Sequence, residues 1–517
     1  MNKANNNEID LDLVVDELSS IVGEKNVSKD LSITIAYSHD QMALTDGPDI
    51  VVLPETIDHI KEIMKIASKY KLPVTPKATG ANMGGLVIPR YGGILVDLKR
   101  LDTIYKIDEE NMTATVGPGV SYGQLQIEAW KKNLFIVNPS GPHSVKVIAN
   151  MTGTRGIGHY AGKFGLGDNQ IIGLEVVLPN GKLIKTGCFT YPSGEKAANC
   201  PHSPGPDVMG LFLGNFGSMG IIVKAKFKLN PKLEAHDLVV FGGKMNEMFD
   251  FLIELVNFGY SNSMLVRWPY ICFLFGRSRE EHMWMLKNPW MDGFILTFIE
   301  GTKKDYEYHF NRLKKFAKEH DIPMGVFGSM IRDNKHLPFI GGGPYNKNDM
   351  QHAFLKEPRK LHDFMFESVR ILRTRGGFAP HCPFFNLHDA KDIWNDQLEY
   401  LKKVKAPLEE TCCYCQVVDD GHYVLQEMDV EFNPDPNKML ANMNSLLGII
   451  KPMVVNMFVE HKEVQYYLYA DGGVFDTAGP VLMPGTTHIL KKMKRLIDPD
   501  HLMNRGKGVS PKEIGGK

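Results

Sequence analysis

Three glycine-rich tracts limit how this chain of 517 residues can fold. They lie at Gly80–Gly85, Asn150–Gly158 and Gly214–Ile222. Glycine permits positive φ and lets the backbone approach a ligand without a Cβ in the way, and successive backbone N–H groups in such loops form concave anion sites. One such tract is usually only a turn. Three tracts so close together are better explained by one extended ligand that lies along a groove.

The usual nucleotide-binding fingerprints are missing from the chain. No G-x-G-x-x-G leads from an expected strand into a helix, which argues against a Rossmann NAD site. Gly162-Lys163 is followed by Phe164 rather than Ser or Thr, so there is no Walker loop.

Apolar patterning around the tracts predicts a mixed fold. We expect strands at Ile50–Leu53, Gly93–Leu98 and Thr113–Val116, and helices from Ile57 and over Ser121–Lys132. Short strands and helices joined by glycine-rich connections are typical of a mixed α and β domain.

The composition and the apolar pattern of the sequence change after the third tract. Residues 223–229 alternate apolar side chains with lysines, which predicts a half-buried strand. The segment 236–478 is richer in aromatic residues and methionine, with helices expected at Tyr306–Glu319 and His362–Arg373. A basic amphipathic helix over Thr487–Ile497 closes the pattern.

The amino-acid composition limits the classes of molecule that this chain is expected to bind. The formal net charge is −1, from 59 basic and 60 acidic residues, so neither nucleic acid nor an acidic membrane surface is indicated. No stretch approaches the roughly 20 apolar residues of a membrane span, and the first residues do not read as a signal peptide. With only seven cysteines and no export signal, we expect reduced thiols and a cytoplasmic location. A homo-oligomer is expected as well.

The order of the tracts resembles the FAD-binding domain of the vanillyl-alcohol oxidase and 4-cresol methylhydroxylase superfamily. The matching stretches are VVLPETIDHIKEIMKIASKYKLPVTPKATGANMGG, GGILVDLKRLDTI, VIANMTGTRGIGHYAGKFGLGD, GLEVVLPNGKLIKTG, GPDVMGLFLGNFGSMGIIVKAKFKLNP and LIDPDHLMNRGKGVSP. Together they cover about residues 40–235 and 485–511.

The resemblance implies an α+β fold, in which a two-subdomain FAD-binding domain carries an α+β cap. The FAD-binding domain would comprise 1–235, the cap 236–480 and a C-terminal return 481–517. The implied cofactor is FAD. The residues expected to contact it are Pro76, Lys77, Ala78, Thr79, Gly80, Ala81, Asn82, Met83, Gly84, Pro139, Ser140, Asn150, Thr152, Gly153, Arg155, Gly156, Gly158, Gly217, Met219, Gly220, Ile221, Ile222 and Arg505.

The chain also departs from the pattern of this superfamily. Its aryl-alcohol enzymes hold a phenolate with two tyrosines and an arginine, but Met83 stands at one tyrosine position and Gly473–Gly479 contains no Tyr-Arg pair. A para-phenol substrate is therefore not expected. Ile148 and Ala149 replace two glycines, and Arg505 stands where a proline is usual.

Four residues are candidates for catalysis. Asp168 falls where the aryl-alcohol enzymes carry an acidic residue beside the flavin. His422 and His461 are cap histidines, and His422 with Tyr423 would be the anchors if the FAD, expected to be dissociable, were covalent. Arg267 stands in an apolar run, and a buried arginine needs either a carboxylate or an anionic substrate.

No metal site is expected. Cys412-Cys413-Tyr414-Cys415 contains one C-x-x-C pair, which without a second cluster indicates packed cysteines in a strand rather than zinc or an iron–sulfur cluster.

The resemblance implies an oxidoreductase that dehydrogenates a small hydroxylated substrate, with hydride passing to the flavin N5. Two alternatives stay open. One is a D-2-hydroxyacid dehydrogenase of the glycolate and D-lactate type, in which Arg267 clamps a carboxylate. The other is a flavoprotein subunit that passes electrons to a separate redox protein instead of oxygen.

Overall fold

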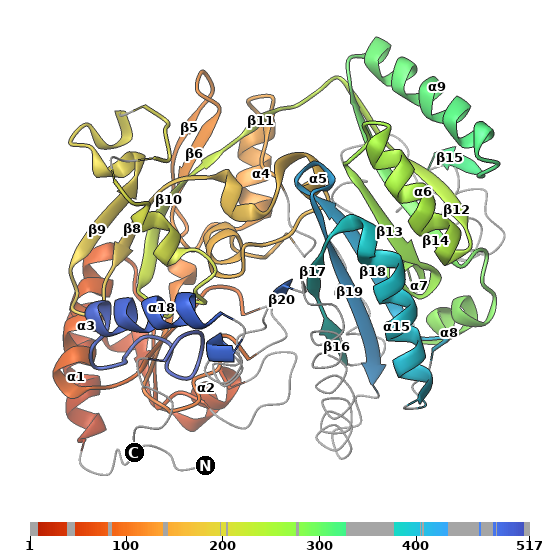
Figure 1. Ribbon diagram of the computed structural model, residues 1–517. Coiled ribbons are helices and arrows are strands. Elements are labelled where there is room, and N and C mark those ends of the chain that lie inside the picture. The colour runs from red at the N-terminus through yellow and green to blue at the C-terminus, as the bar shows by residue number, and fades with distance from the viewer. Residues whose placement is uncertain are drawn as a thin grey trace.

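The computed structural model has two halves, each built on its own sheets (Figure 1). It describes residues 9–38, 47–80, 85–137, 143–196, 198–202, 205–275, 279–326, 377–403, 405, 408–432, 465–466, 479–481 and 483–510.

The first sheet of the N-terminal half has the strand order β1-β2-β4-β3. The helix α3 (Ile57–Tyr70) connects β2 to β3, buries an apolar face, and begins at Thr56, whose hydroxyl accepts a hydrogen bond from the N–H of His59. Strands β2, β4 and β3 run parallel, and β1 is antiparallel to β2. The other elements here are α1 (Leu11–Val22), α2 (Leu31–Ala36), β1 (Val27–Ser28), β2 (Ile50–Val52), β3 (Val74–Lys77) and β4 (Ile94–Asp97).

The second sheet is antiparallel and has the order β5-β6-β10-β8-β9. Its middle strand β10 (Ile221–Lys228) contains the predicted alternation, and Val223, Ala225 and Phe227 are buried as expected. Lys226, predicted to face water, is also buried, so this face of β10 is covered around its middle residue. The remaining elements are β5 (Ile104–Asp108), β6 (Thr113–Val116), α4 (Tyr122–Trp130), β7 (Leu134–Phe135), β8 (Ile171–Val177), β9 (Leu183–Gly187) and β11 (Asn230–Pro231).

The middle of the chain forms a nine-stranded sheet, the cap sheet, with the order β15-β12-β14-β13-β18-β19-β17-β20 and β16 paired to β19. Its strands are β12 (Ala235–Gly243), β13 (Ser263–Arg267), β14 (Gly293–Gly301), β15 (Met324–Val326), β16 (Gly377–His381), β17 (Pro383–Phe385), β18 (Cys412–Val418), β19 (Tyr423–Phe432) and β20 (Gln465–Tyr466). The boundaries 236–480 for a cap domain stay a prediction.

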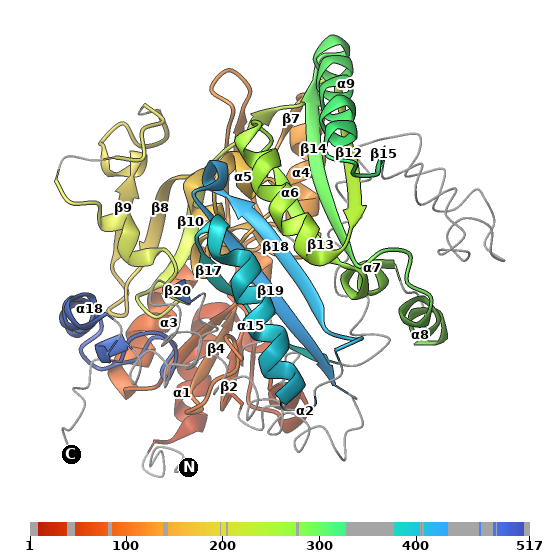
Figure 2. The same cartoon turned by 45° about the vertical axis from the view of Figure 1, so that its right-hand side comes forward.

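Helices cover the outer face of the cap sheet. Figure 2 shows α6 (Met245–Asn257), α15 (Ala390–Lys403) and α9 (Lys303–Glu319) on this side, where they enclose the largest apolar cluster. The inner face packs against α7 (Trp268–Phe275), α8 (Arg279–Lys287) and, through Val137 and Tyr160, the N-terminal half. The helix expected at His362–Arg373 lies outside the described residues.

The cysteine strand is packed, as predicted. Cys412, Cys413 and Cys415 are fully buried free thiols in β18, and burial raises the pKa of Cys415 well above its usual value. A protonated, inaccessible thiol is a poor nucleophile or ligand. In the part of the chain that the structure describes, no group of His, Cys, Asp and Glu could hold a metal ion.

The C-terminal return docks on both sheets of the N-terminal half. Helix α18 (Pro484–Ile497) carries the buried Lys494, whose ammonium pairs with the buried Asp498 at 2.6 Å and donates to the carbonyl of Ser218. Val74, in β3, donates to the carbonyl of Leu502. The return therefore joins the edge of the first sheet to the third glycine tract.

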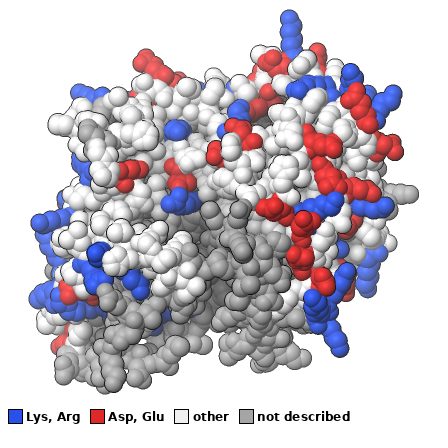
Figure 3. Space-filling view, in the orientation of Figure 1, with Lys and Arg blue, Asp and Glu red and all other residues white. Residues whose placement is uncertain are grey.

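Charges of both signs are mixed over the cap face in Figure 3, whereas basic side chains gather along the lower left edge. Among the helices of the described residues, none is long and apolar enough to cross a membrane.

Candidate functional site

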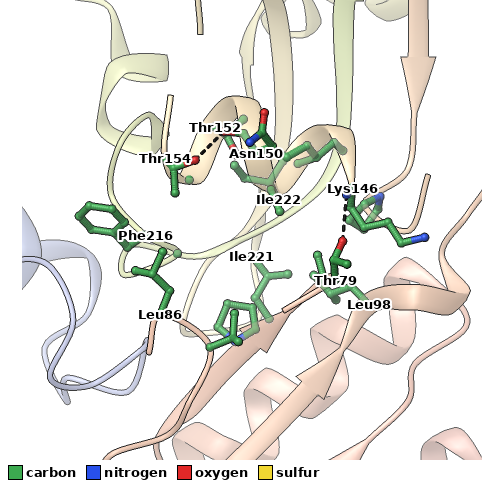
Figure 4. Close-up of a pocket in the computed structure, with 18 of the residues that line it drawn as sticks. Thr79, Leu86, Leu98, Lys146, Asn150, Thr152, Thr154, Phe216, Ile221 and Ile222 are labelled. Atoms are coloured by element: carbon green, nitrogen blue, oxygen red, sulfur yellow. Dashed lines mark hydrogen bonds between the residues drawn. The ribbon is translucent and has the colours of Figure 1, made fainter. Parts of the chain in front are cut away.

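The three glycine tracts meet around one pocket (Figure 4). It holds about 960 Å³ of empty space, counting the part that opens to solvent, which suits an extended ligand of cofactor size. Its lining residues are Pro76, Ala78, Thr79, Gly80, Leu86, Val87, Leu98, Pro118, Val145, Lys146, Ile148, Ala149, Asn150, Thr152, Gly153, Thr154, Asn215, Phe216, Gly217, Gly220, Ile221, Ile222 and Asn504.

Backbone hydrogen bonds tie the tracts together. Gly214 N–H donates to the carbonyl of Thr152 at 2.6 Å, which joins the third tract to the second. Near the first tract, the hydroxyl of Thr79 accepts from Lys146 N–H at 3.0 Å and donates to the carbonyl of Ser144 at 3.2 Å. The pocket walls are therefore held in place by the chain itself.

Two glycines show why the walls need glycine. Gly80 and Gly217 have φ of +73° and +69°, a region that L side chains rarely adopt. A Cβ on Gly217 would also lie 3.0 Å from Cγ of Pro76, another lining residue. Backbone lines the pocket here because side chains do not fit.

The second tract opens with a π-helical turn, η3 (Ala149–Gly153). Such turns carry one extra residue per turn and are frequent at functional sites. Ile148 and Ala149, which replace the two expected glycines, both line the pocket. The altered residues therefore belong to the pocket wall itself.

Eleven of the predicted cofactor residues line the pocket. Arg155, Gly156 and Gly158 belong to the second tract but do not line the pocket. The eleven are Pro76, Ala78, Thr79, Gly80, Asn150, Thr152, Gly153, Gly217, Gly220, Ile221 and Ile222. Those outside the described residues are Ala81, Asn82, Met83, Gly84, Pro139 and Ser140.

Three predicted residues point elsewhere. The ammonium of Lys77 lies 4.6 Å from the ring centre of Tyr37. Met219 is buried in the core beside the second sheet. Arg505 donates to the carbonyls of His501 and Asp500, within the C-terminal return. None of the three lines the pocket, and their role at a cofactor stays a prediction.

Asn504 is a lining residue that the sequence reasoning missed. It is buried, and its Nδ2 donates to the carbonyls of Leu86 at 3.2 Å and Phe216 at 2.6 Å. The side chain thereby joins the loop after the first tract to the third tract. Its place beside Arg505, inside the matching C-terminal stretch, was the available signal.

Asp168 lies at the junction of the two halves. It is in η4 (Gly167–Gln170), and its carboxylate pairs with Arg155 of the second tract at 2.7 Å. Burial raises the pKa of Asp168, while the charge of Arg155 opposes that rise. Asp168 does not itself line the pocket, but the N–H of Gly167 donates to the carbonyl of Gly156 and holds this segment against the second tract.

A cap tyrosine approaches the same ion pair. Burial raises the pKa of Tyr423 to about 12, and the nearby charges of Asp419 and Asp168 contribute to the rise. Tyr423 is half-buried at the start of β19, so the cap reaches Asp168. His422, one residue earlier, is exposed at the end of the turn η9 (Asp419–Gly421), where its ring contacts the carbonyl of Asp419. His461 lies outside the described residues.

Arg267 has its partners within the cap. Its Nε donates to Asp292 at 3.1 Å, and one terminal nitrogen donates to the carbonyls of Leu408 at 2.6 Å and Thr411 at 3.1 Å. Its guanidinium also lies 5.8 Å from the ring centre of Trp394. These contacts account for the burial of Arg267 without a substrate.

Comparison with known proteins agrees with the geometry. Residues 48–187 match the model of a family described as FAD binding domain. The glycolate oxidase subunit GlcD of Bacillus subtilis (strain 168) is 34% identical over 229 residues, which cover 43% of this chain and 45% of that protein. The flavoprotein subunit of 4-cresol dehydrogenase (hydroxylating) of Pseudomonas putida is 29% identical over 224 residues, 42% of each protein. These matches span less than half the length of the relatives.

The solved structures show the fold over the whole chain. A crystal structure of p-cresol methylhydroxylase with substrate bound has a TM-score of 0.80 and 18% identity, covering 98% of both chains. The 4-ethylphenol oxidase of Gulosibacter chungangensis gives 0.79 and 16%, covering 96% of this chain and 97% of that one. The chain therefore has the fold of p-cresol methylhydroxylase, and its residues 48–187 match an FAD binding domain. Its cofactor is FAD, which the size and the backbone-lined walls of the pocket fit.

Proposed function

We propose that this protein is an FAD-dependent oxidoreductase that dehydrogenates a small substrate at a carbon bearing a hydroxyl. The observation that carries the proposal is the half-buried Asp168, which pairs with Arg155 of the second tract and follows Leu166, a residue that packs with Tyr423 of the cap. A carboxylate with a raised pKa at the border of a cofactor pocket is suited to general-base work.

The residues have distinct roles in this proposal. Bound FAD supplies the electron sink, because its flavin accepts a hydride. The lining backbone of the three tracts holds and orients the cofactor. Asp168 accepts the proton of the substrate hydroxyl, and the positive charge of Arg155, which opposes the rise in the pKa of Asp168, favours its ionised form. The inner face of the cap sheet excludes water from the junction.

Sequence similarity favours a second candidate, a dehydrogenase of D-2-hydroxy acids. Besides the glycolate oxidase subunit, a probable mitochondrial D-lactate dehydrogenase of Danio rerio is 26% identical over 217 residues. An acid substrate needs a cation in its pocket. Arg267 is committed to Asp292, so this candidate requires another basic residue.

A substrate screen tests the proposal. The purified full chain, loaded with FAD, would be mixed anaerobically with primary alcohols, secondary alcohols and 2-hydroxy acids, and loss of the flavin absorbance would be followed. Bleaching by any hydroxyl compound supports the proposed activity, and its chemical class selects between the two candidates. A full panel that leaves the flavin oxidised contradicts it.

The electron acceptor is tested in the same assay. We propose either oxygen or a separate redox protein as the acceptor. Rapid peroxide formation on admitting air would identify an oxidase. Slow reaction with air but rapid reduction of an artificial dye would indicate that electrons leave to a partner protein.

A further inference from the structure

The strongest unexplained contact at the pocket involves Tyr122, a residue of α4. Its side chain is 1% exposed, and its hydroxyl donates to Oδ1 of Asn150 at 2.9 Å. Asn150 lines the pocket from the second tract. The buried hydroxyl of Tyr122 therefore holds the oxygen end of the Asn150 amide, at a residue that lines the pocket.

Gly156 confines the same amide from the other side. A Cβ on Gly156 would lie 2.1 Å from Oδ1 and 2.6 Å from Nδ2 of Asn150. The N–H of Gly156 also donates to the Asn150 carbonyl at 2.9 Å. Gly156, predicted as a cofactor contact, thus supplies the space in which the Asn150 side chain lies.

These contacts determine which end of the amide is available. Because Oδ1 accepts from Tyr122, Nδ2 is left as the donor, and it has no hydrogen-bond partner among the described residues. Figure 4 shows Asn150 among the labelled lining residues, in the same turn as Thr152. Burial raises the pKa of Tyr122 well above its usual value, so its hydroxyl stays protonated and remains a donor.

We propose that Tyr122 is a positioning residue that fixes the Asn150 amide so that Nδ2 donates to an acceptor atom of FAD. The acceptor would be a flavin carbonyl or a phosphate oxygen, since Nδ2 can only donate. The inference rests on the FAD site of the proposed function, but it is independent of the substrate.

Replacing Tyr122 with Phe tests this role. Phe keeps the ring in the core and removes only the hydroxyl, which frees the amide to rotate. The full chain would be stripped of flavin, and its dissociation constant for FAD measured by quenching of flavin fluorescence. Without the Tyr122 hydroxyl, the Asn150 amide is no longer oriented for its hydrogen bond to FAD. We therefore expect FAD to bind about threefold to tenfold more weakly.

A double-mutant cycle separates positioning from general destabilisation. If Tyr122 acts only through Asn150, then Tyr122→Phe adds no further loss of FAD affinity to Asn150→Ala. Tyr414→Phe is the matched control, because Tyr414 is equally buried and its hydroxyl donates to Gln416 at 2.9 Å within the cap. It should lower the apoprotein melting temperature about as much and leave FAD affinity unchanged.

The outcomes are distinct. Unchanged FAD affinity in Tyr122→Phe, or additive losses in the cycle, would overturn the positioning role while leaving the proposed function intact. Equal losses of FAD affinity in Tyr122→Phe and Tyr414→Phe would also overturn it. A wild-type chain that binds no FAD would contradict both this inference and the proposed function.

Discussion

Two half-buried carboxylates, Asp168 beside the pocket and Asp237 in the cap, both have a raised pKa but differ in their surroundings. Burial is the largest cause that raises the pKa of each. Asp237 accepts hydrogen bonds from Leu238 N–H at 2.8 Å and the Tyr306 hydroxyl at 3.1 Å, within one unit of strand and helix. Asp168 pairs with a cation of the cofactor tract and faces the cap.

A raised pKa therefore does not by itself identify a reactive group. Asp237 is explained by packing between β12 and α9, whereas Asp168 lies where the cofactor tract meets the cap. The predictions below test whether this difference in surroundings is a difference in function.

The largest effect is expected from Asp168→Asn. The amide keeps the shape of the side chain but cannot accept the substrate proton, so kcat should fall by roughly 10²-fold to 10⁴-fold. Steady-state kinetics with the substrate found by the screen would measure it. FAD affinity should stay near that of the wild type.

Asp237→Asn is the control for this change. It removes the other half-buried carboxylate with a raised pKa, and kcat should be unaltered. An equal fall of kcat in both variants would mean that the two regions do not differ in the way described.

The next effect is on stability and concerns the contact between the two halves. A Cβ on Gly162 would lie 1.9 Å from the carbonyl oxygen of Ser261, so the backbone must shift. We expect Gly162→Ala to lower the free energy of unfolding by about 1–3 kcal/mol. Gly210→Ala, where nothing lies within 4 Å of the added Cβ, serves as the reference in denaturant titrations. Equal stabilities would show that the halves pack less closely.

A smaller effect is expected from Gly153→Ala. Gly153 lines the pocket, and an added Cβ would meet no protein atom within 4 Å. The methyl group should therefore leave apoprotein stability unchanged but take space from the cofactor, weakening FAD binding about tenfold. Unaltered affinity in a fluorescence titration would indicate that the cofactor does not contact this part of the pocket.

The smallest expected effect is a displacement of the pH profile in Arg155→Met. Activity requires ionised Asp168, so it falls as the pH drops below the pKa of Asp168. The charge of Arg155 lowers that pKa; without it, the acid limb of kcat/KM should move to higher pH. A limb that stays in place or moves to lower pH would separate Arg155 from the reacting carboxylate.

Local sequence signals predicted the pocket because its walls are short backbone segments. Their glycines are visible in the sequence and are required by the backbone conformation. Local signals did not predict Asn504, which lines the pocket from the C-terminal return, or Tyr122, whose hydroxyl reaches the lining residue Asn150 from α4. Nor could periodicity show that Lys226 is buried in a central strand, or that Asp292 is the partner of Arg267. Those facts depend on which strands and loops become neighbours.

The most direct test of the FAD site is a titration of the flavin-stripped full chain with FAD. The visible absorption of the bound flavin would report the binding. Saturation is expected at one FAD per chain, with weaker binding in Gly153→Ala and Tyr122→Phe than in the wild type. Two results would contradict the assignment of this pocket to the cofactor. One is a folded chain that takes up no FAD, and the other is an FAD affinity in both variants equal to that of the wild type.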